Sequence, residues 1–241
     1  MKTGIDVSSH QGAIDWGKVK TDFAILRAGW SWYEGGMDID KQFFANVNGV
    51  EEAGIPWGTY LYAYDLTPAA ARVAARKLAD LLAGHKLAYP VAYDFEDNQY
   101  LKYTREANTA CCKAFLEEME SLGYYVSLYT YANFAKANLN MEELSRWDFW
   151  VAAYQEPLTS WTGPWGMWQY SSTGRVDGIQ TNVDLNRTDK DYPAIIRGAG
   201  LNGFGEQPQP PDDTVPKSEY DAMKAKYENL AAAVRELAER V

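Results

Sequence analysis

The spacing of the predicted strands constrains the fold more than any other feature of this sequence. Runs of apolar, β-branched and aromatic residues predict strands over residues 4–8, 23–28, 57–64, 90–96, 125–131, 149–154, 167–171 and 183–186. The second to fifth strands start roughly 30–35 residues apart, which is the length of a βαβ unit. The last strands follow at intervals of about 17 residues, which is too short for a crossover helix and a return strand.

Helical patterns occupy the longer gaps between these strands. One helix is expected over about 41–53, one between Thr67 and Gly84, and one between Thr104 and Gly123, where threonine and glycine are typical end residues. The sequence therefore predicts an α/β fold, a TIM-like barrel with about five β/α units followed by three strands. About 200 residues are available, fewer than the roughly 250 of a standard eightfold barrel, and the missing helices account for the difference.

The composition changes after Phe204 and divides the chain into three parts. Residues 1–204 form the predicted barrel, and residues 205–216, GEQPQPPDDTVP, predict a stiff proline-rich linker. Residues 217–241 predict a C-terminal helix. Its apolar residues alternate at spacings of three and four: Tyr220, Met223, Tyr227, Leu230, Val234, Leu237 and Val241.

This heptad pattern is typical of the seam of a coiled coil. The sequence therefore favours a homo-oligomer through residues 217–241, most simply a dimer. The alternative is that the same apolar stripe folds back onto its own barrel.

The charge balance argues against two classes of partner. Lys and Arg number 23 and Asp and Glu number 33, which gives a formal net charge of −10. Binding to nucleic acid or to an anionic membrane requires a basic surface, so we expect neither partner.

Metal and cofactor chemistry also has little support in the sequence. His10 and His85 lack the spacing of a zinc site, and Cys111 with Cys112 lies inside a predicted helix. A glycine-rich phosphate loop is missing from the sequence as well. We expect no metal and no cofactor.

Four acidic residues are the strongest candidates for chemistry. Asp94 and Glu96 end the fourth predicted strand, where alternate residues share one face and Phe95 points towards the helices. Asp6 lies in the first strand and Asp184 in the eighth, and a closed barrel makes these strands neighbours. Carboxyl groups that repel one another separate into a protonated acid and an ionised partner, the division that glycoside hydrolysis requires.

Aromatic and amide side chains near the strand ends are candidates for binding sugar. Tyr62, Tyr129 and Trp168 are expected to stack on sugar faces or to bond hydroxyl groups. Gln155 and Gln169 close their strands and are expected to bond an acetamido group.

Six segments of the sequence together resemble the family 25 glycoside hydrolases, which are lysozymes common among bacteriophage endolysins. The similarity is carried in order by GIDVSSHQGAIDW, DFAILRAG, GIPWGTYLYAY, YPVAYDFED, WVAAYQ and WQYSSTGRVDGIQTNVDLN, over roughly residues 1–195. The sequence departs from the family at Arg27-Ala28-Gly29-Trp30, where many members have Thr-Glu-Gly.

The resemblance implies a peptidoglycan muramidase that hydrolyses the β-1,4 bond between N-acetylmuramic acid and N-acetylglucosamine. It implies Glu96 as the general acid, Asp94 as its partner carboxylate, and Asp6 and Asp184 as flanking acids of the cleft. For the second step, two routes remain open: attack by the substrate's own acetamido oxygen, or direct attack by water with inversion. A chitinase-like hydrolase of N-acetylglucosamine polymers and a non-catalytic module that binds cell walls are the alternative functions.

The N-terminal residues also suggest where such an enzyme is found. MKTGIDVSSHQG contains no apolar run after the lysine, so no signal peptide is expected. An endolysin of this kind would stay in the host cytoplasm until release and then act on the bacterial cell wall. A secreted enzyme whose leader has been removed is the alternative.

Overall fold

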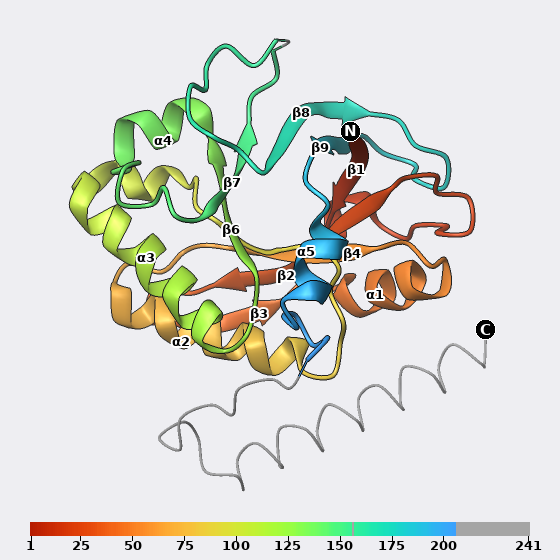
Figure 1. The fold of residues 1–241 in the computed structure, drawn as a ribbon, viewed down its shortest axis with the longest axis horizontal. Coiled ribbons are helices and arrows are strands. Elements are labelled where there is room, and N and C mark those ends of the chain that lie inside the picture. Colours follow the sequence, from red (N-terminus) through yellow and green to blue (C-terminus); the bar gives the residue numbers. More distant parts are fainter. Residues whose placement is uncertain (156, 206–241) are drawn as a thin grey trace, which may run out of the picture. The chain divides into compact units, whose positions relative to one another are not determined.

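A closed barrel of eight strands forms the centre of the computed structural model, which describes residues 1–155 and 157–205 (Figure 1). The eight barrel strands are β1 (Lys2–Val7), β2 (Phe23–Ser31), β4 (Trp57–Tyr62), β5 (Val91–Asp94), β6 (Val126–Tyr131), β7 (Asp148–Ala152), β8 (Met167–Gly174) and β9 (Val183–Thr188). A further strand, β3 (Met37–Ile39), pairs with β2 outside the closed ring. The α-helices are α1 (Phe43–Glu52), α2 (Pro68–Leu82), α3 (Arg105–Ser121), α4 (Ala132–Asn138) and α5 (Tyr192–Gly198). Two 3-10 turns are η1 (Ser9–Gln11) and η2 (Asn98–Lys102).

The direction of the last strand distinguishes this barrel from a fully parallel one. The sheet order is β1-β9-β8-β7-β6-β5-β4-β2-β3, and a further pairing of β1 with β2 closes the ring. The pairs from β1 through β2 and β4 to β8 are parallel, whereas β9 is antiparallel to both β8 and β1. The beginning of β9 therefore lies at the end of the barrel where the other strands finish.

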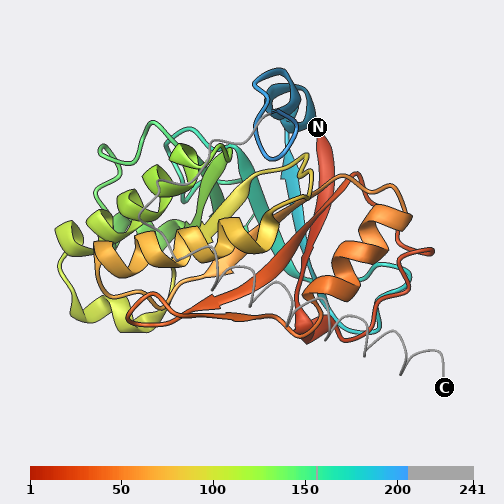
Figure 2. The ribbon, with the colours of Figure 1, turned by 90° about the horizontal axis from the view of Figure 1, so that it is seen from below.

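The two sides of the sheet are covered differently. Inside the barrel, Phe23, Ile25, Trp150 and Met167 belong to one apolar cluster, which α5 completes with Tyr192. Figure 2 shows α5 beside the start of β1, at the end of the barrel where the parallel strands begin. A second cluster outside the sheet packs the strands against α1, α2 and α3. Apolar residues thus fill the interior at the end where the parallel strands begin, and polar residues gather at the end where these strands finish.

Local sequence explains the outer helices. The Thr67 hydroxyl accepts a hydrogen bond from the Ala70 amide, and Pro68 occupies the first turn of α2. In the same way the Thr104 hydroxyl caps α3 through the Ala107 amide. The buried face of α2 carries Ala70, Ala71, Ala74, Ala75, Leu78 and Leu82, which repeat at helical spacing.

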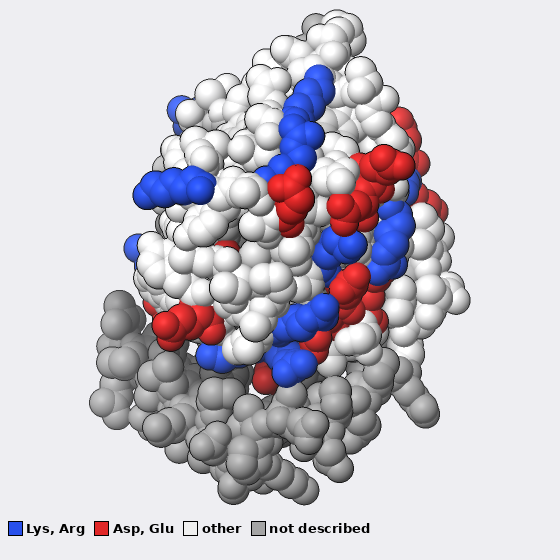
Figure 3. Space-filling model, turned by 90° about the vertical axis from the view of Figure 1, so that its left-hand side faces the viewer, with Lys and Arg blue, Asp and Glu red and all other residues white. Residues whose placement is uncertain are grey.

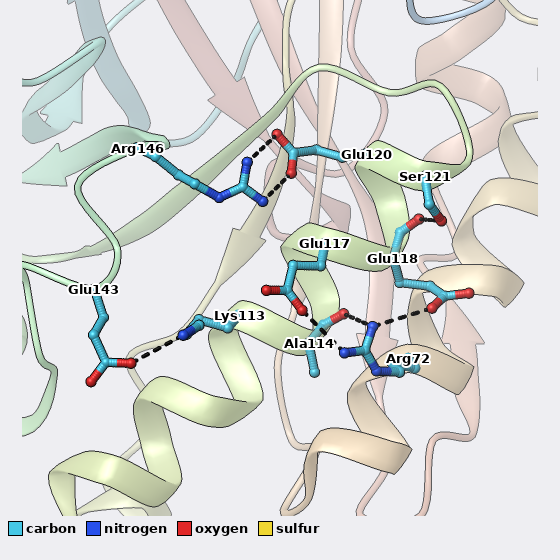
Figure 4. Close-up of polar contacts among 9 residues, drawn as sticks. All are labelled: Arg72, Lys113, Ala114, Glu117, Glu118, Glu120, Ser121, Glu143 and Arg146. Carbon is cyan, nitrogen blue, oxygen red and sulfur yellow. Dashed lines mark hydrogen bonds and ion pairs between the residues drawn. The ribbon is translucent and has the colours of Figure 1, made fainter.

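Ion pairs link the exposed faces of α2 and α3 (Figure 4). Arg72 of α2 lies 3.1 Å from Glu117 and 3.4 Å from Glu118 of α3. Arg146, in the segment before β7, lies 2.6 Å from Glu120 of α3. Figure 3 shows basic and acidic side chains interleaved on this side of the molecule. Such partly exposed pairs each contribute at most about 1 kcal/mol, so burial of the apolar face holds the helices in place.

The predicted strands are all present, and their ends differ by a few residues. Between β1 and β2, residues 8–22 contain the 3-10 turn η1 in place of a helix, so α-helices follow β2, β4, β5 and β6. The sequence pattern does not predict β3, α4 or α5, because β3 and α4 are short and β3 lacks apolar alternation. The predicted linker and C-terminal helix lie outside the described residues, apart from Gly205.

Within the described part of the chain, no helix is long and apolar enough to cross a membrane.

Asn202 fastens the segment after α5 to the underside of the barrel. Its backbone has a φ of 54°, in the left-handed region, and its side chain is fully buried. The side-chain amide donates to the carbonyls of Leu87 and Tyr89 at 3.1 and 2.9 Å, and its oxygen accepts from the Tyr125 amide at 2.7 Å. One side chain thus satisfies backbone groups just before β5 and β6.

We expect Asn202→Ala to lower the free energy of unfolding by about 3 kcal/mol, because buried polar groups lose their partner and alanine disfavours a positive φ. Urea denaturation of both proteins measures the difference. Asn48→Ala, at an exposed position in α1, should stay within about 0.5 kcal/mol of the wild type. Equal urea denaturation midpoints for Asn202→Ala and wild type would contradict the stabilising role of Asn202.

Candidate active site

A polar cavity of about 300 Å³ opens at the end of the barrel where the parallel strands finish. Its lining contains all four predicted acids and three of the predicted sugar-binding residues. The lining residues are Asp6, His10, Arg27, Tyr60, Tyr62, Asp94, Glu96, Tyr129, Tyr131, Trp150, Tyr154, Gln169, Ser172 and Asp184.

Asp94 and Glu96 reach the cavity from the end of β5. Asp94 is the last residue of the strand, and Phe95 turns outward, where its ring stacks on Tyr100 with centroids 3.7 Å apart. The outward turn of Phe95 directs Glu96 back over the barrel mouth, as the alternation of the sequence predicts.

Burial raises the pKa of both carboxyl groups. The pKa of Glu96 rises to about 7, against a hydrogen bond from Tyr129 that lowers it. The pKa of Asp94 is raised by burial and then by the charges of Glu96 and Asp6, while the Arg27 guanidinium lowers it. Because Arg27 favours the Asp94 anion, we assign the proton of this pair to Glu96 near neutral pH.

Each of these carboxyl groups also keeps an oxygen free of protein partners. Among the described residues, Oδ1 of Asp94 and Oε2 of Glu96 are buried without a hydrogen-bond partner. A buried polar atom of this kind is costly unless it serves a ligand or a reaction.

Asp6 and Asp184 face each other across neighbouring strands, because the antiparallel register of β1 and β9 pairs them directly. Oδ2 of Asp6 accepts from the Gln169 amide at 2.9 Å and from the Asn186 amide at 2.7 Å. Trp150 donates to the other side of Asn186 at 2.7 Å, which fixes the amide with its NH₂ group towards Asp6.

The pKa of Asp6 is raised by burial and by the adjacent charge of Asp184. Burial raises the pKa of Asp184 as well, but the hydrogen bond between the two carboxyl groups lowers the pKa of Asp184 and raises that of Asp6. The proton of this second pair therefore belongs to Asp6, and the cavity wall keeps one negative charge on Asp184.

Tyrosines hold Gln169 in position. Its Oε1 accepts from the hydroxyls of Tyr129 and Tyr154, both at 2.9 Å, and Tyr154 lies 3.2 Å from the Tyr131 hydroxyl. Gln169 thus connects the tyrosines of β6 and of the loop after β7 with Asp6.

Arg27 and His10 line the cavity, although the sequence patterns did not assign them to it. Arg27 donates to Asp40 through Nε at 2.7 Å and to the Ser9 hydroxyl at 3.0 Å. His10 lines the same cavity as Asp184. The signal for Arg27 was present: a charged residue inside the apolar run FAILRAG requires a buried partner.

Trp168 and Gln155 do not line this cavity, which corrects the sequence-based expectation. Because Gln169 points inward, the neighbouring Trp168 lies on the outer face of β8, where its Nε1 donates to the Ala153 carbonyl at 2.8 Å. The Arg187 guanidinium lies 3.9 Å from its ring centroid. Gln155 lies beyond the end of β7, exposed and bonded to the Thr159 hydroxyl at 3.0 Å.

With this fold and cavity described, comparison with known proteins defines the class. Residues 5–179 match the model of glycosyl hydrolases family 25. The chain belongs to this family and is a glycoside hydrolase by that membership, which confirms the resemblance seen in the sequence. The matched range ends before β9, so Asp184 and Asn202 lie outside it.

Individual relatives agree with this class. The chain is 29% identical to Lysozyme M1 of Streptomyces globisporus over 204 residues, covering 76% of this chain and 66% of the relative. It is 30% identical over 193 residues to the uncharacterized protein YegX of Escherichia coli strain K12, covering 76% and 68%. The modular autolysin LytC from Streptococcus pneumoniae superposes with a TM-score of 0.69 at 30% identity, covering 77% of this chain. The present chain spans 46% of the LytC chain.

The raised pKa of Glu96 predicts a stability effect that is independent of activity. A carboxyl whose pKa is 4.5 when free and about 7 when folded stabilises the protein below pH 4.5, and this contribution is lost as the pH rises through 7. Glutamine does not titrate, so Glu96→Gln does not lose stability in this way as the pH rises. We expect the stability of the variant relative to wild type to increase by about 3 kcal/mol between about pH 4 and about pH 8.

Chemical denaturation at both pH values measures this change. The control is Glu52→Gln at an exposed site of α1, whose stability difference from wild type should not change with pH. If Glu96→Gln and wild type also differ by a constant amount, the pKa of Glu96 is not raised.

Proposed function

We propose that this protein is a muramidase, which hydrolyses the β-1,4 bond between N-acetylmuramic acid and N-acetylglucosamine in peptidoglycan. The observation that carries the proposal is a buried Glu96 with a pKa of about 7 beside Asp94, inside a family 25 barrel. Similarity to proteins named as a lysozyme and an autolysin supports the choice of substrate.

Glu96 acts as the general acid in this proposal. A carboxyl group with a pKa near the working pH is protonated often enough to donate and is acidic enough to do so readily. The unpartnered Oε2 is the atom that would deliver the proton to the glycosidic oxygen as the bond breaks. The stacking of Phe95 on Tyr100 holds the backbone immediately before Glu96.

Asp94 prepares the second step. Its unpartnered Oδ1 would accept the N–H of the substrate's 2-acetamido group and orient the acetamido oxygen for attack on the anomeric carbon. The Arg27 charge, itself held by Asp40, opposes the rise in the pKa of Asp94 and so favours the anionic form that this bond requires. We favour this substrate-assisted route over direct attack by water because the free oxygen belongs to the residue beside the acid.

Asp184 contributes a negative charge across the cavity. Bond cleavage generates an oxocarbenium-like transition state with positive charge on the sugar ring. A fixed carboxylate in a site shielded from water stabilises that charge more in the transition state than in the ground state.

Glu96→Gln is the direct test of the acid. The amide keeps the shape of the side chain and cannot supply the proton, so we expect turbidity clearing of peptidoglycan to slow by roughly 100-fold or more. Glu52→Gln should clear peptidoglycan at the wild-type rate. Clearing by Glu96→Gln near the wild-type rate would remove Glu96 from the mechanism.

Analysis of the products identifies the bond. Mass spectrometry of the digest should show fragments with reducing N-acetylmuramic acid ends, and NMR should show net retention at the anomeric carbon. Reducing N-acetylglucosamine ends, or cleavage of chitin oligomers in preference to peptidoglycan, would contradict the muramidase assignment. Net inversion would exclude the substrate-assisted route.

A further inference from the structure

A row of aromatic rings leads from the cavity towards the tip of the β2–β3 hairpin. Tyr62 lines the cavity, and its ring centroid lies 5.0 Å from that of Tyr64. Tyr64 in turn stacks on Trp32 at 6.3 Å, with 19° between the planes. Trp30 meets Trp32 edge to face at 6.5 Å. The row is therefore continuous from the cavity outward.

The outer end of this row remains in solvent. Trp32 is 44% exposed, whereas many other aromatic residues of the chain are buried in the core. Rings that only stabilise a fold are buried by it, whereas a row of partly exposed rings beside a cavity marks a binding surface.

The backbone that carries Trp32 is firmly held. The Trp32 amide donates to the Gly36 carbonyl at 2.7 Å, and the Gly35 amide donates back to the Trp32 carbonyl at 2.8 Å. At Gly29, an added Cβ would lie 1.8 Å from the Asp38 carbonyl oxygen, so only glycine allows β3 to pack against β2 here. The hairpin thus holds the backbone of Trp32 in place before any ligand binds.

A buried hydrogen-bond chain fixes Tyr64 in the same way. The Tyr64 amide donates to the Ser31 hydroxyl at 2.9 Å, and that hydroxyl donates to Asp65 at 2.7 Å. Ser31 and Asp65 are completely buried. The segments that carry the stacked rings, just after β2 and β4, are therefore tied together by these hydrogen bonds.

We propose that Trp32 and Tyr64 form a distal sugar subsite, which holds a pyranose ring of the glycan strand beyond the rings bound in the catalytic cavity. Flat aromatic rings pack against the C–H face of a pyranose. The Tyr62 hydroxyl, which donates to Asp97 at 3.1 Å, can still accept a hydrogen bond from a sugar hydroxyl. Continuity with the cavity through Tyr62 favours an extended glycan over a protein partner. The identity of this ligand rests on the proposed muramidase function.

The test compares substrates of two lengths. We expect Trp32→Ala to lower the ratio of kcat/KM for polymeric peptide-free glycan to kcat/KM for a tetrasaccharide by roughly fivefold, because the short substrate cannot reach the subsite. Trp32→Tyr keeps a ring and should restore most of the ratio. Ile195→Ala, an exposed change on α5, should leave the ratio as in wild type.

The outcomes separate this inference from the proposed function. An unchanged ratio in Trp32→Ala, whether both substrates are cleaved normally or both are slowed equally, would overturn the subsite while leaving a muramidase. If wild type cleaves neither substrate, the proposed function fails. Calorimetric titration of polymeric glycan into Glu96→Gln then decides the subsite. Weaker binding on addition of Trp32→Ala supports it, and equal or absent binding overturns it.

Discussion

Removal of Asp6 and Asp94 from water is the constraint on which the rest of the site depends. A buried carboxylate loses its hydration, so its charged form survives only where hydrogen bonds or a cation offset the loss. Asp94 receives the field of Arg27, whereas Asp6, despite two amide hydrogen bonds, keeps the proton of its pair with Asp184. Burial raises the pKa of Glu96 to about 7, which makes this carboxyl group an acid near neutral pH.

The barrel provides these supports from residues far apart in the sequence. Because β9 runs antiparallel, Asp184 at its beginning lies beside Asp6 at the mouth of the barrel. The same reversal brings Asn186 within reach of Asp6, where Trp150 from β7 fixes its orientation. An additional parallel strand in this position would present its C-terminal end instead and could not place the same residues. The exchange of a last β/α unit for an antiparallel strand is thus part of how the site is assembled.

Much of this arrangement could be predicted from the sequence because it depends on short-range periodicity. Alternation of apolar residues located the strands, and closure of the barrel predicted that Asp6 and Asp184 are neighbours. The position of Trp168 could not be predicted in this way, because a shift of one residue in register exchanges the inner and outer faces of β8. Arg27 and His10 line the cavity because of tertiary structure: Arg27 is held there by Asp40, and His10 lies in the turn after β1. The β2–β3 hairpin that leads to Trp32 requires the close approach of the two strands at Gly29, and no local sequence pattern predicts this hairpin.

Direct titration of Glu96 tests the central claim, that burial makes this carboxyl group the acid of the site. Carbon-detected NMR of the side-chain carboxyl groups follows each glutamate with pH, and the signal that disappears in Glu96→Gln belongs to Glu96. The account predicts a midpoint at about 7 for that signal. A midpoint near 4.5, the value of an unperturbed glutamate, would contradict it.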